Sequence, residues 1–362
     1  MPVGIGIAGA GVISNQYLTN LARYPEVEVV AIGDLDTGRA AAQAEAYGVP
    51  SSGSLQTVLD HPGVHIVVNL TIPTAHVEVS TAAVRAGKHV WTEKPLGLDR
   101  ASARALLDEA ATLGLEVCCA PDTVLGPGIQ ATLRAIADGS VGPALSGLAI
   151  MQSGGPDAWH PSPEFFYAPG GGPVLDIGPY YLTSLVLALG AVTSVVAGGG
   201  RAREVRTVLA GPNTGATFAV SVPTTANVLL RHASGASSVC LFSFDSGVRR
   251  GGVLEFQCAE ATVVAPDPNQ FDGVLRTQVG GEVNSELEIG NGGTGRGIGI
   301  VDLVRSLADG TTPRASGELA YHVLDIMLAI EESIASGNPV AVSSVPPTVL
   351  PLPADWSPLS PR

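Results

Sequence analysis

The stretch VGIGIAGAGVIS, residues 3–14, decides the fold of the N-terminal half of this chain. Its apolar start predicts a buried strand, and the residues after it have helical character. The turn between them reads Gly9-Ala10-Gly11-Val12-Ile13-Ser14. Gly9 permits the tight turn, Gly11 lets the backbone approach a pyrophosphate, and the helix N-terminus offers free N–H groups to that charge. Ser14 replaces the third glycine of the motif and is small enough for helix–strand packing.

Strands and helices alternate through the first third of the chain. We expect strands at 3–8, 27–32, 65–70, 89–92 and 115–119, and helices at 12–23, 37–47, 76–86 and 99–113. This alternation is typical of a parallel sheet covered on both faces. The pattern changes near residue 122, so the predicted first domain is an α/β domain at residues 1–122.

The rest of the chain, residues 123–362, is expected to form an α+β domain with a largely antiparallel open sheet. Candidate strands are 144–152, 192–200, 215–222, 226–233, 236–244 and 252–264, and candidate helices are 176–189, 297–309 and 316–336. Short turns between the strands favour an antiparallel meander. We expect the two late helices to pack back on the body as an amphipathic pair and the proline-rich tail from 337 to be irregular.

Charge and cysteine content exclude several functions. The net charge of −14 argues against nucleic acids and anionic membrane surfaces as partners. Basic residues cluster only at Arg249-Arg250 and around Arg201, Arg203 and Arg206, and a solvated strand end or loop explains either group equally well. The four cysteines have no zinc spacing and are expected to be buried reduced thiols, with no metal site.

The uncharged stretch 177–200 is long enough to span a bilayer. Gly190 and the run Gly198–Gly200 interrupt it, so we interpret it as a buried helix followed by a strand. No Lys or Arg precedes Arg23, which is unlike a signal peptide. A cytoplasmic location is therefore expected.

Several residues after the predicted strands are candidates for cofactor binding. Asp34 ends the second strand, 23 residues after Gly11, which is near the spacing of a carboxylate that binds an adenosine ribose. Leu35 follows where a site that prefers NADP often has Ser or Arg, so NAD is favoured over NADP. Thr71-Ile72-Pro73 follows the third strand and His76 opens the next helix, on the edge where ligands bind. An ordinary strand–helix turn and helix-start packing are the alternatives for this segment.

Lys94 is one of only two lysines in a chain with 17 arginines. It lies in Glu93-Lys94-Pro95, directly after the fourth predicted strand and on the same edge. Because the pKa of a lysine shifts readily near a reaction centre while arginine stays charged, a lysine kept here indicates chemistry. An ordinary solvated lysine at a strand end is the alternative.

A second group of candidates follows the glycine run 170–172 in GGGPVLDIGPYY, residues 170–181. A charged Asp176 within an apolar stretch is costly unless it is paired or functional. On a helix, Asp176 and Tyr180 would share one face because they are four residues apart. Helix capping by Asp176 and burial of Tyr180 against a backbone group are the alternatives.

Together these motifs resemble the family of glucose–fructose oxidoreductase and inositol dehydrogenase, Gfo/Idh/MocA. The matching pieces are Gly9-Ala10-Gly11, Asp34, Thr71-x-Pro73 with His76, Glu93-Lys94-Pro95, and Gly172-x-x-x-Asp176-x-Gly178-x-Tyr180. Tyr180 stands where the family more often has His, as in a tyrosine-using subset. Asp122-Thr123-Val124 departs from the Asn-x-Arg-like segment of many members.

The resemblance implies a Rossmann domain that binds NAD or NADP, followed by a substrate domain. The open sheet of that domain often serves as an oligomer interface, so a homodimer or homotetramer is expected. The implied catalytic set is Lys94, Asp176 and Tyr180. The pKa of a free tyrosine is about 10, so a tyrosine acid/base needs nearby positive charge, which Lys94 and the oxidised nicotinamide can supply. Lys94 could itself be the proton shuttle, and Asp176 would orient the substrate or hold Lys94 charged.

Trp159-His160 lies upstream in a Pro/Gly-rich loop. An indole face suits the apolar face of a sugar ring, and His160 could bond hydroxyls, although loop packing explains both equally well. The leading hypothesis is an NAD(P)-dependent oxidoreductase that interconverts a secondary alcohol and a ketone on a sugar, sugar derivative, polyol or cyclitol. The alternatives are an NAD-dependent glycosidase that uses transient oxidation and a non-catalytic dinucleotide-sensing regulator.

Overall fold

The computed structural model describes residues 1–360, which form two compact units. The first unit contains Met1–Pro127, Asn291–Tyr321 and the C-terminal segment from Leu352, and the second contains Gly128–Gly290 and His322–Pro351. The first unit thus includes late segments that a single boundary after residue 122 assigns to the second domain.

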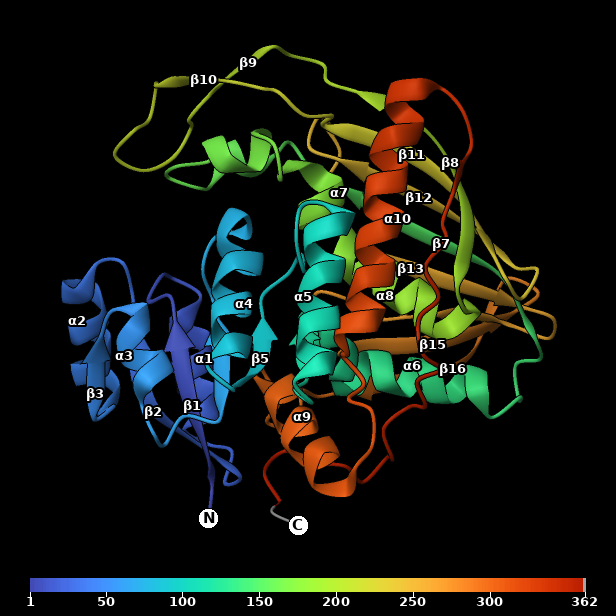
Figure 1. Cartoon of the computed structure of the whole chain (residues 1–362). Helices are drawn as coiled ribbons and strands as arrows, with labels where there is room; N and C mark the ends of the chain where they lie inside the picture. Colours follow the sequence, from blue (N-terminus) through green and yellow to red (C-terminus); the bar gives the residue numbers. More distant parts are fainter. Residues whose placement is uncertain (361–362) are drawn as a thin grey trace. The chain divides into compact units, whose positions relative to one another are not determined.

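A six-stranded parallel sheet forms the centre of the first unit (Figure 1). Its strands are β1 (Val3–Ala8), β2 (Val27–Gly33), β3 (Ser51–Gly53), β4 (Ile66–Asn69), β5 (His89–Thr92) and β6 (Val117–Cys119). The order is β3-β2-β1-β4-β5-β6, and every neighbouring pair is parallel. All four residues of β4 are buried, which fits a sheet covered on both faces. The predicted Rossmann fold is confirmed. Successive strands are added on one side of β1 up to β3 and on its other side from β4 onward, so the topological switch point lies between β1 and β4.

Helices connect these strands. They are α1 (Ser14–Leu21), α2 (Thr37–Tyr47), α3 (Leu55–Asp60), α4 (His76–Arg85) and α5 (Arg100–Thr112), with short 3-10 turns η1 (Pro73–Ala75) and η2 (Asp122–Leu125). The four predicted helices are present, with α2 at its predicted bounds and the other three slightly shorter, while α3 and β3 were not predicted. Helix α9 (Ile298–Asp309) also belongs to this unit, where Gly299 lies directly against the buried Trp91 ring.

The second unit is built on a nine-stranded mixed sheet. Its strands are β7 (Ala144–Gln152), β8 (Val192–Gly200), β11 (Thr225–His232), β12 (Ser237–Ser243), β13 (Arg250–Cys258), β14 (Thr262–Val264), β15 (Gly273–Val279), β16 (Glu282–Ile289) and β17 (Val340–Ala341). Their order is β16-β15-β14-β13-β7-β12-β11-β8-β17, and only the β7–β12 pair is parallel. The predicted open, largely antiparallel sheet is confirmed.

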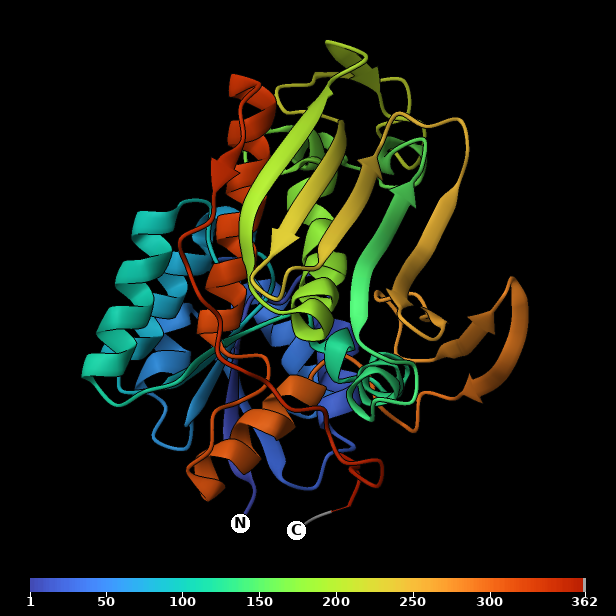
Figure 2. The same ribbon diagram turned by 90° about the vertical axis from the view of Figure 1, so that its right-hand side faces the viewer.

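The remaining elements of this part of the chain are helices and one small sheet. They are α6 (Pro127–Ala137), η3 (Pro156–Ala158), η4 (Glu164–Tyr167), α7 (Gly172–Asp176), α8 (Gly178–Leu189), α10 (Gly317–Ser336) and the β9 (Val205–Thr207) and β10 (Thr217–Ala219) pair. Helix α8 packs on the sheet, with Leu185 beside Gly147 of β7. Figure 2 shows α8 behind the strands, whose opposite face is turned to the viewer.

Two expectations for this region need correction. The predicted helix at 176–189 begins two residues later, as α8, with Pro179 in its first turn, where proline favours a helix start, and Asp176 instead ends the separate short helix α7. The late helices do not form a pair on one body, since α9 lies in the first unit whereas most of α10 lies in the second.

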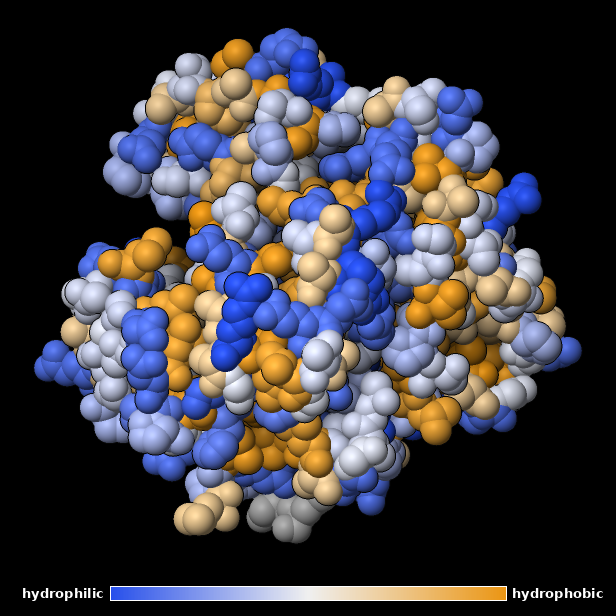
Figure 3. All heavy atoms as spheres, in the orientation of Figure 1, coloured by the Kyte–Doolittle hydropathy of each residue, from blue (hydrophilic) through white to orange (hydrophobic). Residues whose placement is uncertain are grey.

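The uncharged stretch 177–200 forms α8 and then β8, as expected. Within residues 1–360, none of the helices combines the length and the apolar character needed to cross a membrane. On the face drawn in Figure 3, hydrophobic residues are interspersed with hydrophilic ones.

Candidate functional site

The glycine turn after β1 has the geometry that the sequence predicts. Gly9 has a φ of +103°, and a Cβ there would lie 2.8 Å from the carbonyl carbon of Leu70, so only glycine fits without strain. A Cβ on Gly11 would meet nothing within 4 Å, so the space beside this backbone is open. The turn therefore exposes its backbone at Gly11 while Gly9 packs against the end of β4.

Free backbone donors lie in the same turn. The Ala10 N–H donates to Asp34 Oδ2 at 2.7 Å, but the N–H groups of Gly11, Val12 and Ile13 have no acceptor in the part of the chain that the structure describes. They precede α1, whose N-terminus carries a partial positive charge. Three open donors at a helix N-terminus fit the pyrophosphate of a dinucleotide.

Asp34, directly after β2, is already fully hydrogen-bonded. Its Oδ1 accepts from Asp36 N–H at 2.8 Å and Arg39 Nη2 at 2.7 Å, and its Oδ2 accepts from Ala10 N–H at 2.7 Å and Arg39 Nε at 3.2 Å. Burial alone would raise the pKa of Asp34, but the bonds from Arg39, Ala10 and Asp36 lower it overall. The carboxylate thus stays ionised at the position expected for the adenosine ribose.

Thr71 and His76 belong to a buried network after β4. Asn69 Oδ1 accepts hydrogen bonds from Thr71 N–H at 3.2 Å and Thr71 Oγ1 at 2.6 Å. His76 Nδ1 lies 2.6 Å from the Pro95 carbonyl oxygen, and its Nε2 lies 3.1 Å from the Thr71 carbonyl oxygen. Burial lowers the pKa of His76, although both carbonyl oxygens favour the protonated ring. His76 therefore joins the loop after β4 to the loop after β5.

Ile72 and Pro73 lie in the same loop. Ile72 is exposed, and Pro73 starts the 3-10 turn η1. An exposed apolar side chain beside the glycine turn is free to contact a flat ring, so both residues stay candidates for cofactor contact.

Glu93 and Lys94 follow β5 on a buried support. Tyr17 donates its hydroxyl to Glu93 Oε1 at 2.8 Å, and Trp91 Nε1 donates to the Tyr17 oxygen at 3.2 Å. Glu93 Oε2 accepts the Lys94 backbone N–H at 3.1 Å. The helix after the glycine turn and the end of β5 are thereby held together, and they fix the backbone from which the Lys94 side chain starts.

Asp122 occupies the segment where the sequence departs from the family pattern. It is buried in the first unit, where its Oδ2 accepts the Gly297 N–H at 2.6 Å and its Oδ1 lies 3.4 Å from Arg296 Nη1. Burial raises the pKa of Asp122 to about 6, and Arg296 and Gly297 offset part of that rise. In this chain Asp122 thus anchors the start of α9 to η2.

The candidates of the second unit gather partly at one pocket. Asp176 and Trp159 both line a pocket of about 270 Å³. Tyr181 is the tyrosine that lines it, with its hydroxyl accepting the Gly252 N–H at 2.9 Å, whereas Tyr180 lies buried in the first turn of α8. The expectation that Asp176 and Tyr180 share one face of a continuous helix is wrong. Asp176 ends α7, whereas Tyr180 lies in α8.

The glycines before Asp176 pack against protein. A Cβ on Gly171 would lie 2.5 Å from the Phe165 carbonyl oxygen, and Gly172 has a φ of +84° with the Pro223 carbonyl oxygen 3.0 Å from its Cβ position. These glycines therefore permit close packing with η4 and with the loop before β11.

Trp159 and His160 belong to an aromatic group with Phe165 and Phe166. The His160 ring centroid lies 5.3 Å from those of both phenylalanines, and its Nδ1 accepts the Ser162 N–H at 3.1 Å. The Trp159 side chain is 65% exposed and lies edge-on to His160. Trp159 is thus available to a ligand, while His160 mainly supports the loop.

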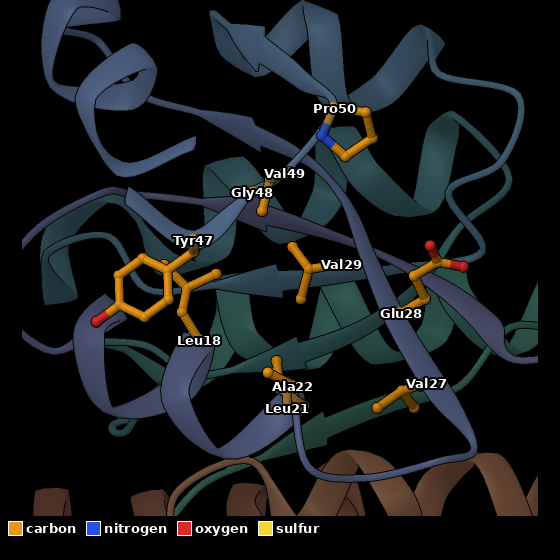
Figure 4. Close-up of a pocket in the computed structure, with 10 residues that line it drawn as sticks. All are labelled: Leu18, Leu21, Ala22, Val27, Glu28, Val29, Tyr47, Gly48, Val49 and Pro50. Atoms are coloured by element: carbon orange, nitrogen blue, oxygen red, sulfur yellow. The ribbon is translucent and has the colours of Figure 1, made fainter. Parts of the chain in front are cut away.

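A second pocket, of about 230 Å³, lies in the first unit (Figure 4). It is lined by Val27, Glu28 and Val29 of β2 together with residues of α1 and the end of α2. These β2 residues belong to the amino-terminal half of the strand, whereas Asp34 follows its carboxyl end. This pocket is therefore separate from the cofactor candidates.

The structure thus brings the N-terminal candidates to one sheet edge. Gly9, Asp34, Thr71 and Glu93 all follow the carboxyl ends of β1, β2, β4 and β5. The supporting residues Tyr17, Asn69 and Arg39 were not predicted. Asn69 could have been found from the sequence, because an asparagine at the end of a buried strand needs hydrogen-bond partners.

Comparison with known proteins gives family matches to both halves of the chain. Residues 3–120 match the model described as "Oxidoreductase family, NAD-binding Rossmann fold", and residues 129–264 match the "GFO/IDH/MocA C-terminal domain". The chain is 30% identical over 188 residues to trans-1,2-dihydrobenzene-1,2-diol dehydrogenase of Bos taurus, which covers 51% of this chain and 55% of that protein. The match therefore spans just over half the length of this relative.

Two solved structures have the same fold. An NAD binding oxidoreductase from Klebsiella pneumoniae has a TM-score of 0.83 and 22% identity, covering 95% of this chain and 100% of that one. A levoglucosan dehydrogenase in complex with NADH and L-sorbose has a TM-score of 0.82 and 20% identity, covering 94% and 99%.

Proposed function

Because the chain belongs to the GFO/IDH/MocA family of NAD-binding oxidoreductases, we propose that it interconverts a secondary alcohol and a ketone on a sugar, sugar derivative, polyol or cyclitol. The observation that carries this proposal is the set of open N–H donors at Gly11, Val12 and Ile13, beside an ionised Asp34. This arrangement fits a dinucleotide with a free ribose diol. NAD is accordingly the favoured cofactor, and NADP is the alternative.

The remaining cofactor contacts are assigned from the same sheet edge. Gly9 shapes the turn, and Thr71, Ile72 and Pro73 would border the nicotinamide half. His76 and Glu93 would position these loops through the contacts described above. When bound, the nicotinamide would supply the hydride acceptor or donor.

The proposed proton chemistry uses Lys94, Asp176 and Tyr180. Tyr180 would take the substrate hydroxyl proton during oxidation and return it during reduction. Lys94 would supply the positive charge that makes a phenolate accessible, and Asp176 would orient the substrate hydroxyls. A direct proton transfer by Lys94 is the alternative.

Support for a sugar-like substrate comes from the pocket and from one structural neighbour. Trp159 offers an exposed indole face at a pocket that also contains Asp176, an arrangement suited to a ring that has one apolar face and several hydroxyls. The levoglucosan dehydrogenase structure contains NADH and L-sorbose.

We also propose that the chain assembles through the outer face of its large sheet. Val196, Leu229 and Val239 lie side by side on β8, β11 and β12, and they are 44%, 39% and 50% exposed. An apolar row across neighbouring strands suits an isologous contact with a second copy. A homodimer or homotetramer follows from this proposal. A cytoplasmic location is proposed as well, with the four buried free thiols as support.

The proposed function is tested by a panel of sugars, polyols and cyclitols assayed with NAD and with NADP. At least one member of the panel should give a lasting rise in the absorbance of reduced nicotinamide. Product formation without any net reduced nicotinamide would support the glycosidase alternative instead. Tight NAD binding without turnover of any member would favour a sensing role.

A further inference from the structure

The pocket of the second unit contains two arginines that the proposed chemistry does not use. Arg249 and Arg250 line it together with Trp159 and Asp176. Across residues 1–360, neither guanidinium forms a salt bridge, whereas Arg39, Arg206 and Arg305 all pair with carboxylates. The two positive charges therefore lie side by side at the lining of this pocket.

The backbone holds this pair at the pocket. Arg250 begins β13, opposite Gln152 at the end of β7, and the register between the two strands shifts between Arg250 and Val253. Gly252 in this irregular segment has a φ of +72°, and its N–H donates to the Tyr181 hydroxyl at 2.9 Å. Such irregularities redirect side chains at the ends of strands. The bulge and its hydrogen bond to Tyr181 thus fix the backbone positions from which the two arginine side chains extend.

Two acids, Asp176 and Asp267, and the amide of Gln152 line the same pocket. Burial raises the pKa of Asp267, which favours its neutral form, although the Asn269 N–H partly offsets that rise. Asp176 is the other acid that lines the pocket. Gln152 Oε1 is buried there and has no hydrogen-bond donor among the described residues, so a ligand hydroxyl would satisfy it.

We propose that this pocket binds an anionic sugar derivative, with Arg249 and Arg250 on a carboxylate or phosphate and the Trp159 indole against the ring. The guanidinium fork matches the oxygens of either group, and charge-assisted hydrogen bonds of this kind are stronger than neutral ones. The inference rests on the proposed function, because it names the substrate class of the same site. It predicts that a neutral sugar is the poorer ligand.

The test compares the intact wild type with the double variant Arg249→Gln/Arg250→Gln and the matched control Arg203→Gln. Arg203 is an exposed arginine of the same unit that does not line the pocket. Glucose, glucuronate and a glucose phosphate serve as probes, first in equilibrium binding by calorimetry with NADH present and then in turnover with NAD. Binding is measured separately so that it does not depend on activity.

In the wild type, glucuronate or the glucose phosphate should bind roughly tenfold or more tightly than glucose. The double variant should lose this preference, mainly through KM, and its weak affinity for glucose should change by no more than about twofold. The control Arg203→Gln should keep the wild-type affinity for all three probes. The stronger of the two anions identifies the group that is recognised.

Equal binding of glucose and both anions, or an anion preference that survives in the double variant, would overturn the inference while leaving the proposed function intact. Anion binding that depends on the two arginines, without any turnover, would support the pocket and contradict the proposed function. No binding of any probe would contradict the pocket assignment.

Discussion

Arg39 donates hydrogen bonds to both carboxylate oxygens of Asp34, with Nη2 2.7 Å from Oδ1 and Nε 3.2 Å from Oδ2. Together with the two backbone N–H groups, these bonds fill the lone-pair directions of the carboxylate. A ribose diol that binds Asp34 must therefore displace or share the Arg39 guanidinium. The Arg39 side chain is half exposed, so it has room to move away from Asp34 when a ribose binds.

Arg39 is accordingly predicted to determine how well NADP is tolerated. In the variant Arg39→Ala, the 2′-phosphate of NADP meets Asp34 without a nearby cation, so NADP affinity should fall about threefold to tenfold. NAD affinity should stay equal or rise, because the diol no longer competes with the guanidinium. Fluorescence titration of both cofactors measures this, with Arg85→Ala, which removes another exposed pair, as the control.

An equal loss of NAD and NADP affinity in Arg39→Ala would show that the pair only supports the fold. The variant Asp34→Ser with Leu35→Arg should move the preference toward NADP. An unchanged preference in that variant would mean that another residue reads the ribose.

Lys94→Met is predicted to keep NAD binding and to lose most turnover, by a factor of about 10² to 10⁴. The methionine preserves the length of the side chain but removes the charge. Lys88→Met is the matched control, since Lys88 is the only other lysine and its Nζ donates to the Val64 carbonyl at 2.8 Å. Steady-state kinetics and NAD titration of the two variants measure these effects. Equal turnover in Lys94→Met and Lys88→Met would contradict the catalytic role of Lys94.

Asp122 gives a prediction for stability against pH. Its pKa in the folded chain is about 6, above the ordinary value of 3.8, because burial opposes its charge. The folded state therefore binds this proton more tightly than the unfolded chain does. The resulting stabilisation is fully present below about pH 4 and is lost as the pH rises through about 6.

The variant Asp122→Asn keeps an oxygen that can accept the Gly297 N–H and removes the titration. Relative to this variant, the free energy of unfolding of the wild type should fall between about pH 4 and 6, by on the order of 1–3 kcal/mol. Urea unfolding at several pH values measures the difference, with the exposed Asp60→Asn as the control. Parallel pH curves for wild type and Asp122→Asn would contradict the role assigned to burial.

The outer face of the sheet gives a prediction for assembly. Val239→Arg places a charge in the middle of the apolar row with Leu229 and Val196, so the oligomer should dissociate while the fold is retained. Val345→Arg, at an exposed position in the tail, should leave the assembly unchanged. Light scattering after size exclusion reports the mass, and an unaltered oligomer in Val239→Arg would place the interface elsewhere.

The fold was predictable where hydrophobic patterns are strong. The apolar runs of β1, β2, β4 and β5 and the glycine turn specified the parallel sheet. β3 was missed because Ser51–Gly53 has no apolar residue and forms only by pairing with β2. β16 was missed for a similar reason, since most of it is exposed and it lacks a buried face.

The site was predictable only in its motif residues. Gly9, Asp34 and Glu93 follow strand ends that the sequence identifies. Tyr17, the partner of Glu93, became visible only in the structure, because the spacing of 76 residues between them carries no local signal. The same limit applied to Arg249 and Arg250, which the sequence explained as a solvated strand end or loop and which line a pocket in the structure.

The central claim is net hydride transfer between a substrate carbon and NAD. It is tested most directly with a substrate found in the panel and deuterated at the carbon that carries the reacting hydroxyl. The account predicts one deuterium in the reduced nicotinamide for each ketone formed, measured by mass spectrometry after a full conversion. Product that forms while the nicotinamide stays oxidised and free of deuterium would contradict it.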